Sequence, residues 1–325
     1  MDETGPYRLV TPMSLVRIIE DTFFSVCRYW GGLQNAFDCF GPVRAMQTGI
    51  GSADLNMVWS EGPLTREDAP WVRQVETYYD QANLPYWWWI FPRSKTAETI
   101  RLLKDTGHVY LLSMPCLLAD LDDLSAIAPA ENFAQPHKFN NRHSREYPNH
   151  LKVARGHECG NPVFSRGSWI PAFDGMTNQG VTQRSPAVII RRVGNQQDLS
   201  PWKEVTFAGF DFSQGDRTSY DRFTDAFPLD PASPQQAFLA FDGGKPVAAS
   251  LLFLAGDAAG LYFITTLGDY RRRGIGREMV LATLHYARAA GARFASLQSS
   301  PDGLSVYEKA GFKECCRVDI YGRKA

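Results

Sequence analysis

The sequence contains no apolar run that approaches the roughly 18 to 20 residues needed to span a bilayer. It also lacks an excess of either charge, because 34 Lys and Arg residues face 35 Asp and Glu residues and leave a formal net charge of -1. Proteins that bind nucleic acid or anionic membranes generally need a strong basic excess. We therefore predict that the protein binds neither.

An export signal is missing as well. The N-terminus opens with acids and has neither the basic flank nor the apolar core of a signal peptide. The six cysteines are scattered through a long chain, which favours free and mostly buried thiols. Cys315 and Cys316 lie in a strand-like run, where neighbouring side chains point to opposite faces, so no disulfide is expected between them. These features predict a cytoplasmic protein.

The chain divides into three regions that differ in composition and in the spacing of their apolar residues. Residues 1–127 and 187–325 carry regular helix and strand signals, and the composition, at 44% hydrophobic and 13% aromatic, is ample for a buried core. Residues 128–186 are rich in Asn, Gly, Pro, Arg and His, with few regularly spaced apolar residues. A structureless stretch of this length is unusual inside a compact domain, so we interpret it as a poorly ordered insertion or linker.

Histidines in the middle region raise the question of a metal. His137, His143, His150 and His157 accompany Cys159, but their spacings match no standard pattern of metal ligands. The basic residues around them are better explained as a solvated loop than as a nucleic-acid site. We predict no metal site.

The first region alternates helices and strands, with local signals at their ends. Thr65, followed by Asp68 and Pro70, is a helix start, and Gly107 is a helix stop. The predicted elements are a helix over 14–30, a strand over 54–59, a helix over 65–83, an aromatic strand over 85–91, a helix over 96–106 and a strand from 108 to 113 or 118.

The last region has more strands. A tight hairpin turn is predicted at residues 242–245, and Gly291 and Gly311 each close a helix. The predicted elements are a strand over 187–193, helices over 201–212 and 216–227, strands over 237–241, 247–253 and 260–267, a long helix over 275–290, a strand over 293–298, a short helix over 302–310 and a strand over 312–321.

Residues 260–276 carry the pattern with chemical meaning, a strand that enters a glycine-containing loop and then a long helix. The first amides of a helix have no internal partner and carry the positive end of its dipole, so they suit a pyrophosphate. Gly274 and Gly276 let phosphate oxygens approach the backbone, and the arginines at 271–273 add positive charge. In isolation such a pattern is more often an ordinary basic loop that caps a helix. The surrounding sequence therefore decides between this interpretation and a pyrophosphate site.

That context resembles the GNAT superfamily of N-acetyltransferases, whose signature is Gln/Arg-x-x-Gly-x-Gly/Ala between the fourth strand and the third helix. Arg271, Gly274 and Gly276 match it position for position. A second match is Tyr-Glu-Lys-Ala-Gly-Phe at residues 307–312, which is similar to the end of the family's fourth helix. The resemblance covers about residues 187–321 in element order. It implies an α/β (α+β) fold in which helices flank a mixed central sheet.

The resemblance also implies acetyl-CoA as the acyl donor and roles for the matching positions. Backbone groups of residues 264–266 would pair with the pantetheine arm, amides of residues 272–277 would hold the pyrophosphate, and Tyr307 would return a proton to the departing thiolate. A phenol with a pKa of about 10 suits this role, although a core aromatic with a satisfied hydroxyl is the alternative. The predicted cofactor-binding residues are Ile264, Thr265, Thr266, Arg271, Arg272, Arg273, Gly274, Ile275, Gly276, Arg277 and Ser300.

Two features depart from the family pattern. Residues 260–267 and 293–298 contain no acid, whereas some relatives place a general base on these strands. Ser300 stands where many relatives have an Asn that contacts the cofactor. A base is still needed, because a protonated amine has no lone pair to attack a thioester. Water is one route for the proton, and the weak candidates among side chains are Asp269, Ser299 and Asp302.

Residues 54–118 repeat the order strand, helix, strand, helix, strand of the second half of a GNAT domain. In the loop before their first helix, Glu61, Glu67 and Asp68 stand where a phosphate site needs amides and positive charge. This half is therefore similar to a degenerate GNAT copy that has lost cofactor binding. The run Trp87–Trp89 could line a substrate cleft, but core or inter-domain packing is the favoured interpretation.

These features predict a tandem, partly degenerate GNAT enzyme that moves an acetyl group from acetyl-CoA to a primary amine by direct attack in a ternary complex. The predicted acceptor is a small molecule or amino acid held between the halves, because clefts at domain interfaces favour small ligands. The alternatives are a protein acetyltransferase acting on N-termini or lysines, a non-catalytic acyl-CoA-binding regulatory protein, and a product damaged by the insertion. For the oligomeric state, a homodimer is one of the alternatives.

Overall fold

The computed structural model describes residues 12–123, 188–301 and 303–323. Within these residues the strands form one 11-stranded sheet in the order β1-β2-β3-β4-β11-β5-β10-β9-β8-β7-β6. The segment 128–186 that the sequence predicts as an insertion lies outside the described residues. No helix in the described parts of the chain is long and apolar enough to cross a membrane.

The first described segment begins with a long helix and continues as strands alternating with helices. The sequence does not predict the β1–β2 hairpin, because strands of four residues are too short for an alternating pattern to be recognised. The elements are α1 (Pro12–Gln34), β1 (Phe37–Phe40), β2 (Val43–Met46), β3 (Met57–Ser60), α2 (Ala69–Ala82), β4 (Trp87–Ile90), α3 (Ala97–Asp105) and β5 (His108–Asp120).

The second described segment follows the predicted order of elements throughout. The helix predicted at 201–212 begins earlier, because the Asn195 side chain accepts the backbone N–H of Asp198 and caps the helix there. The elements are β6 (Val188–Arg192), α4 (Gln196–Gly209), α5 (Arg217–Asp225), β7 (Gln235–Asp242), β8 (Lys245–Ala255), β9 (Ala258–Thr266), α6 (Ile275–Ala289), β10 (Phe294–Gln298), α7 (Leu304–Lys309) and β11 (Lys313–Arg323).

Each half contains the same unit, β3-α2-β4-α3-β5 in one and β9-α6-β10-α7-β11 in the other. The first two strands of each unit are parallel, and these are the only parallel neighbours in the described sheet. A helix crosses over between the two parallel strands, as parallel pairing requires. The repeat predicted from the sequence is confirmed.

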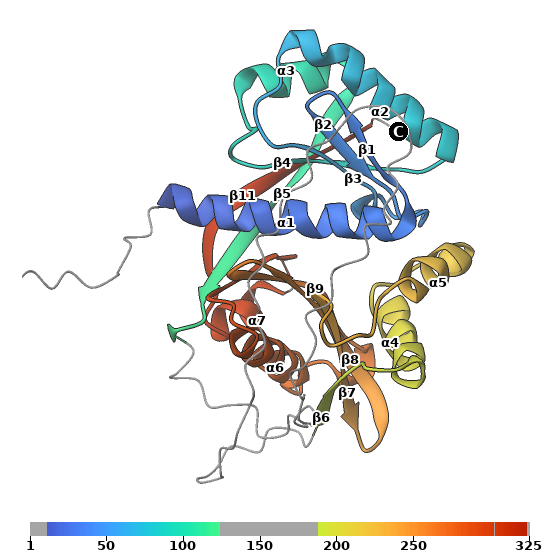
Figure 1. Ribbon diagram of the computed structural model, residues 1–325, viewed down its shortest axis with the longest axis vertical. Coiled ribbons are helices and arrows are strands. Elements are labelled where there is room, and N and C mark those ends of the chain that lie inside the picture. The colour runs from blue at the N-terminus through green and yellow to red at the C-terminus, as the bar shows by residue number, and fades with distance from the viewer. Residues whose placement is uncertain (1–11, 124–187, 302, 324–325) are drawn as a thin grey trace, which may run out of the picture.

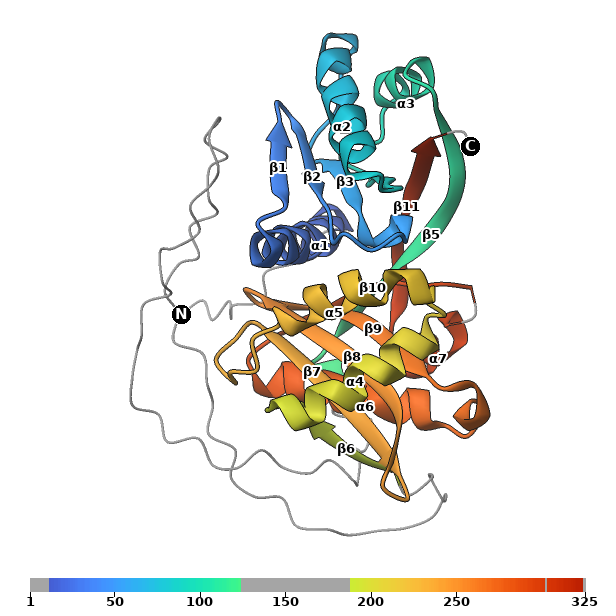
Figure 2. The ribbon, with the colours of Figure 1, turned by 90° about the vertical axis from the view of Figure 1, so that its right-hand side faces the viewer.

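The last strands of the two units have exchanged places. β5 lies between β11 and β10, although it follows α3, and β11 lies between β4 and β5, although it follows α7. The two strands are antiparallel partners from His108 opposite Arg323 to Leu118 opposite Lys313. Figure 2 shows β11 rising among the strands of the N-terminal half beside β5. The two regions that the sequence predicts as separate domains therefore share one sheet.

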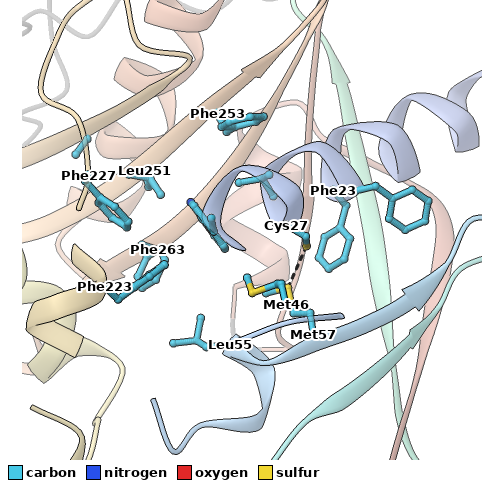
Figure 3. Packing of buried hydrophobic residues seen from close by; sticks show 14 of the residues in the cluster. Phe23, Cys27, Met46, Leu55, Met57, Phe223, Phe227, Leu251, Phe253 and Phe263 are labelled. Carbon is cyan, nitrogen blue, oxygen red and sulfur yellow. Dashed lines mark hydrogen bonds between the residues drawn. The ribbon is translucent and has the colours of Figure 1, made fainter. Parts of the chain in front are cut away.

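The long helix α1 lies between the two halves (Figure 1). Its buried residues include Phe23, Cys27 and Trp30, which belong to one hydrophobic cluster with residues of both halves (Figure 3). The Trp30 ring meets Phe223 of α5 and Phe263 of β9 edge to face, with centroids 5.8 Å apart in each case. Around α1 the space between the halves is thus a packed core.

The tryptophan run on β4 packs into this core and its counterpart on the other face of the sheet. Trp89 joins the cluster around α1, whereas Trp88 joins a cluster covered by α2 and α3. Both rings are buried, because successive residues of a strand face opposite sides and helices cover each side here. The prediction of core packing is confirmed for Trp88 and Trp89.

Two expectations about cysteines need correction. Cys39 is disulfide-bonded, so the prediction of free thiols is wrong at this residue, although Cys27, Cys116, Cys315 and Cys316 are free. Cys315 is the extra residue of a β-bulge, because Glu314 lies opposite Leu117 while Cys316 lies opposite Cys116. A bulge interrupts the alternation of side chains, and both Cys315 and Cys316 pack against the same cluster. The prediction that they face opposite sides is therefore wrong.

A buried histidine should make the N-terminal half sensitive to acid. His108 Nε2 lies 2.9 Å from Tyr86 Oη and 3.1 Å from Trp88 Nε1, which can only donate, so this nitrogen is an acceptor and the ring is neutral. Burial lowers the pKa of His108 to about 4. The unfolded ring has its ordinary pKa of about 6.5, so stability present above pH 6.5 is lost as the pH falls toward 4.

We expect the free energy of unfolding, measured with urea, to fall by up to about 1.4 kcal/mol per pH unit between pH 6.5 and 4 because of this residue. His108→Gln keeps an acceptor and a donor but cannot take up the proton. Its free energy of unfolding should depend less steeply on pH in this window. Equal slopes in the variant and the parent protein would contradict the assignment.

Candidate active site

The candidate site begins where two parallel strands separate. β9 and β10 are paired only over Ala258–Gly260 and Phe294–Ser296. β9 continues to Thr266 along β8, but beyond Gly260 no strand in the described parts of the chain pairs with its other edge. Backbone groups on this edge of β9 are consequently available to an extended ligand.

A β-bulge sets which backbone groups face the opening. Thr265 lies opposite Ala249 and Tyr262 lies opposite Leu251, so two residues of β9, Phe263 and Ile264, oppose a single residue of β8. Phe263 has a φ of 49°, in the left-handed region that non-glycine residues rarely adopt. The bulge therefore changes the direction in which the backbone groups at the end of β9 point.

The direction of the last β9 residues follows from one hydrogen bond. Leu267 donates its N–H to the carbonyl of Val247 on β8, at 2.9 Å. By alternation the backbone groups of Thr265 face β8 and those of Thr266 face the opening, whereas Ile264 belongs to the bulge, where the alternation is interrupted. The Thr266 carbonyl already accepts Arg271 Nε at 2.9 Å. Of the three predicted residues, alternation thus directs Thr266 toward the opening.

The Thr265 side chain has a packing role instead. A Cβ added to Gly209 at the end of α4 would come within 2.3 Å of Thr265 Oγ1. Only a glycine leaves room for this threonine, so Thr265 fixes how closely α4 approaches β9. No alternation pattern in the sequence reveals this contact, because the two residues lie far apart in the chain.

The loop after β9 presents a run of unpaired amides. Arg272 and Gly274 have φ values of 65° and 84°, both left-handed. The N–H groups of residues 272–277 find no acceptor within the described residues, and the first bond of the helix is donated by Glu278 to the Gly274 carbonyl at 3.1 Å. Successive amides in such a loop, joined to a helix N-terminus, form a concave anion site.

The predicted arginines of this loop differ in what they contact. Arg271 bonds the end of β9, as described above. Arg273 donates to the Asp269 carbonyl at 2.7 Å and lies over the Tyr270 ring, and Arg277 is 3.2 Å from Glu278. Arg272 is exposed and forms no ion pair or hydrogen bond within the described residues. Two arginines therefore brace the loop, while Arg272 is free to meet an anion.

The glycines of the motif serve different needs. Gly274 adopts the left-handed backbone conformation at which α6 begins, where a side chain would be strained. A Cβ on Gly276 would meet only Thr266 Oγ1, at the ordinary distance of 3.4 Å. The fold itself therefore tolerates a side chain at 276, so packing within the described residues does not require a glycine there.

Tyr307 on α7 is half-buried, with its ring edge-on to Phe312 at a centroid distance of 6.0 Å. Its hydroxyl forms no hydrogen bond within the described residues. Burial raises the pKa of Tyr307 to about 12. The phenol is consequently protonated at neutral pH and able to donate.

The remaining predicted residues are not equally placed. Ser299 is fully buried and donates its hydroxyl to the Ser300 carbonyl at 2.7 Å. Ser300 is exposed, and its Oγ accepts the N–H of Gly303 at 3.3 Å. Asp269 is exposed in the short turn before the loop, and Asp302 lies outside the described residues. None of these contacts identifies a general base.

The same position in the N-terminal half is closed. β3 and β4 are paired from Met57 opposite Trp87 to Trp59 opposite Trp89, so these strands do not separate. Pairing along nearly their full length leaves no strand edge for a ligand arm. The difference from β9 and β10 is one of backbone register and not of side-chain identity.

The protein's own side chains occupy the amides before α2. Leu64 donates its N–H to Thr99 Oγ1 at 2.9 Å, Thr65 to Asp68 Oδ2 at 2.8 Å, and Arg66 to Glu98 Oε1 at 3.4 Å. Pro70, in the first turn of α2, has no N–H. Carboxylates thus sit where a phosphate would need free donors, as the sequence predicts for Asp68. Glu98, from the next helix, could not be predicted from the loop alone.

The other two predicted acids lie around this loop. Glu61 forms an ion pair with Arg28 of α1. Glu67 lines an acidic hollow together with Thr65, Arg66 and Glu98. Within the described residues no cluster of His, Cys, Asp or Glu could hold a metal ion. The histidine-rich stretch from His137 to Cys159 lies outside them.

The comparison with protein families finds a match in the C-terminal half. Residues 200–312 match the model of the acetyltransferase (GNAT) family. The similarity to the family is shown for these residues and not for the chain as a whole. The match spans the opening between β9 and β10, the amide loop and Tyr307, so the predicted cofactor-binding residues and Tyr307 lie within it. No curated protein matches the sequence.

Solved structures extend the likeness of fold to the whole chain. A GCN5-related N-acetyltransferase from Kribbella flavida superposes with a TM-score of 0.57 at 14% identity, covering 94% of this chain and 96% of that one. A GCN5-related N-acetyltransferase from Sphaerobacter thermophilus does so with a TM-score of 0.50 at 12% identity, covering 87% and 76%. At these identities the likeness concerns the fold alone. The predicted GNAT fold, with helices flanking a mixed sheet and a GNAT-like N-terminal half, is confirmed.

Proposed function

We propose that the protein transfers an acetyl group from acetyl-CoA to a primary amine of a small molecule or amino acid. The observation that carries the proposal is the run of unpaired amides at residues 272–277, next to the opening between β9 and β10. In this proposal the amides and Arg272 bind the pyrophosphate. Backbone groups of Ile264 and Thr266 bind the pantetheine arm, which orients the thioester in the opening.

The reaction is a direct transfer. The neutral amine nitrogen attacks the thioester carbonyl, a C–N bond forms, and the C–S bond breaks as the tetrahedral intermediate collapses. Tyr307 donates its phenolic proton to the leaving thiolate and later recovers a proton from solvent. The amine loses its proton to water in this proposal, since none of the described side chains at the opening is placed as a base.

A thiol-release screen tests the activity. The purified chain is given acetyl-CoA and a panel of small amines, amino acids and peptides, and free CoA is measured with a thiol reagent. We expect release with a small amine or amino acid. Release with peptides alone would favour a protein acetyltransferase. Binding of acetyl-CoA without release from any acceptor would favour a regulatory acyl-CoA-binding protein and contradict the proposed enzyme.

The two halves should also differ in binding. Because amides are open before α6 and filled before α2, titration calorimetry should give one acetyl-CoA per chain. A stoichiometry of two would show that the N-terminal half binds as well. Arg66→Ala, in the N-terminal loop, serves as a control and should leave the affinity for acetyl-CoA unchanged.

A further inference from the structure

Two thiols face each other at the junction of the two halves. Cys116 on β5 and Cys316 on β11 are directly opposite each other in the antiparallel ladder of the exchanged strands. Directly opposed residues of such a pair have Cα atoms about 4.5 to 5.5 Å apart. A disulfide spans Cα distances of about 4.4 to 6.8 Å. The backbone at this pair is therefore compatible with a covalent bridge without a rearrangement of the sheet.

The two thiols also interact with each other, and only one is reachable. Cys116 is fully buried against the cluster around α1, whereas Cys316 is half-buried. The hydrogen bond between the thiols lowers the pKa of Cys316 and raises that of Cys116, while burial and the nearby carboxylates of Glu20 and Glu314 oppose the lowering at Cys316. Cys316 is thus the thiol that a small oxidant meets first.

A third thiol supplies an internal comparison. Cys315 is half-buried like Cys316 but is the extra residue of the bulge, so no residue of β5 lies opposite it. Burial raises the pKa of Cys315. Neighbours in sequence therefore differ in the one feature that a disulfide needs, a partner thiol across the strand.

We propose that Cys116 and Cys316 form a reversible disulfide when the folded protein meets hydrogen peroxide. The Cys316 thiolate attacks the peroxide oxygen, the O–O bond breaks, and a sulfenic acid and one hydroxide form, which takes up a proton to give water. The Cys116 sulfur then attacks the sulfenic sulfur, its proton leaves with the hydroxyl as a second water, and the S–S bond forms. Two thiols are oxidised and one peroxide is reduced.

The bond would join the two halves covalently at the point where they exchange strands. It closes a loop of about 200 residues in the unfolded chain, which removes much of that chain's conformational entropy. We expect the midpoint of thermal unfolding to rise by about 5 to 10 °C on oxidation. A reductant should reverse the rise.

The test uses the full-length protein treated with hydrogen peroxide, alkylated in denaturant, digested without reduction and mapped by mass spectrometry. We expect a peptide pair that links Cys116 to Cys316 in the parent protein and in Cys315→Ser. It should be absent in Cys316→Ser, whose unfolding midpoint should not rise on oxidation. Circular dichroism establishes that each variant is folded.

Other outcomes overturn the proposal. These are a link from Cys315 to either neighbour, conversion of Cys316 to higher oxides without a link, or full retention of the free thiols after treatment. A shift of the midpoint that is the same in the parent protein and in Cys316→Ser also overturns it, because the change would then originate elsewhere, as at the disulfide of Cys39.

Discussion

Tyr307→Phe should lower kcat for acetyl transfer by about 100- to 10,000-fold, the contribution expected of a positioned general acid. The hydroxyl has no partner within the described residues, and burial raises its pKa to about 12, so the phenol can donate to a thiolate and is not ionised at neutral pH. Acetyl-CoA should bind to the variant with nearly unchanged affinity. Steady-state kinetics and calorimetry on the same preparation separate the two effects.

Tyr286→Phe is the matched control. This tyrosine is also half-buried and packs against the same cluster, but it lies on α6 against Phe238 and away from the opening. Its removal should leave kcat within about twofold. Because of the raised pKa of Tyr307, kcat of the parent protein should not decline near pH 10 through loss of the acid. A Tyr307→Phe variant with full kcat would show that the thiolate is protonated from another source.

Gly276→Asp should weaken acetyl-CoA binding by at least about 100-fold, since a carboxylate would take up the open amides and repel a diphosphate. The N-terminal half already contains this arrangement, with Asp68 and Glu98 on its loop amides. The fold should not suffer, because a side chain at 276 has room and an acid in the first turn favours the helix. Calorimetry measures the affinity, and thermal unfolding checks the fold.

The control for Gly276→Asp introduces the same negative charge at a nearby position of the loop. Gly268 has open space around a potential Cβ and lies upstream of the amide run. Gly268→Asp should weaken binding only a few-fold, and salt should reduce that effect. Equal losses in both variants would mean that the general field of the loop, and not the bare amides, holds the cofactor.

Local signals of the sequence predict much of this fold. Thr65 with Asp68 forms the capping box expected of a helix start, and Gly107, Gly291 and Gly311 end helices with left-handed φ values. Each of these features depends on backbone conformation and hydrogen bonds within a few residues, so it can be recognised without knowledge of the rest of the chain. The amide loop at 272–277 belongs to the same class.

The site residues also differ in whether local sequence patterns can predict them. The glycines and Tyr307 are identified by their spacing, because the loop and α7 are local structures. The direction of Thr265 depends on the bulge opposite β8, and the bracing role of Arg271 depends on the Thr266 carbonyl. In the N-terminal half, Glu98 reaches the loop from another helix. Spacing in the sequence does not predict such contacts between residues on different elements.

The sequence by itself determined most of the elements, their order, the repeat of the two halves and the glycine-containing loop before α6, since all of these follow from short-range patterns. Only the tertiary structure decided that β5 and β11 exchange places, that α1 fills the space between the halves, and that Cys116 meets Cys316. The physical reason is that an antiparallel edge accepts any strand of suitable length. Which strand it receives depends on packing between residues far apart in the chain.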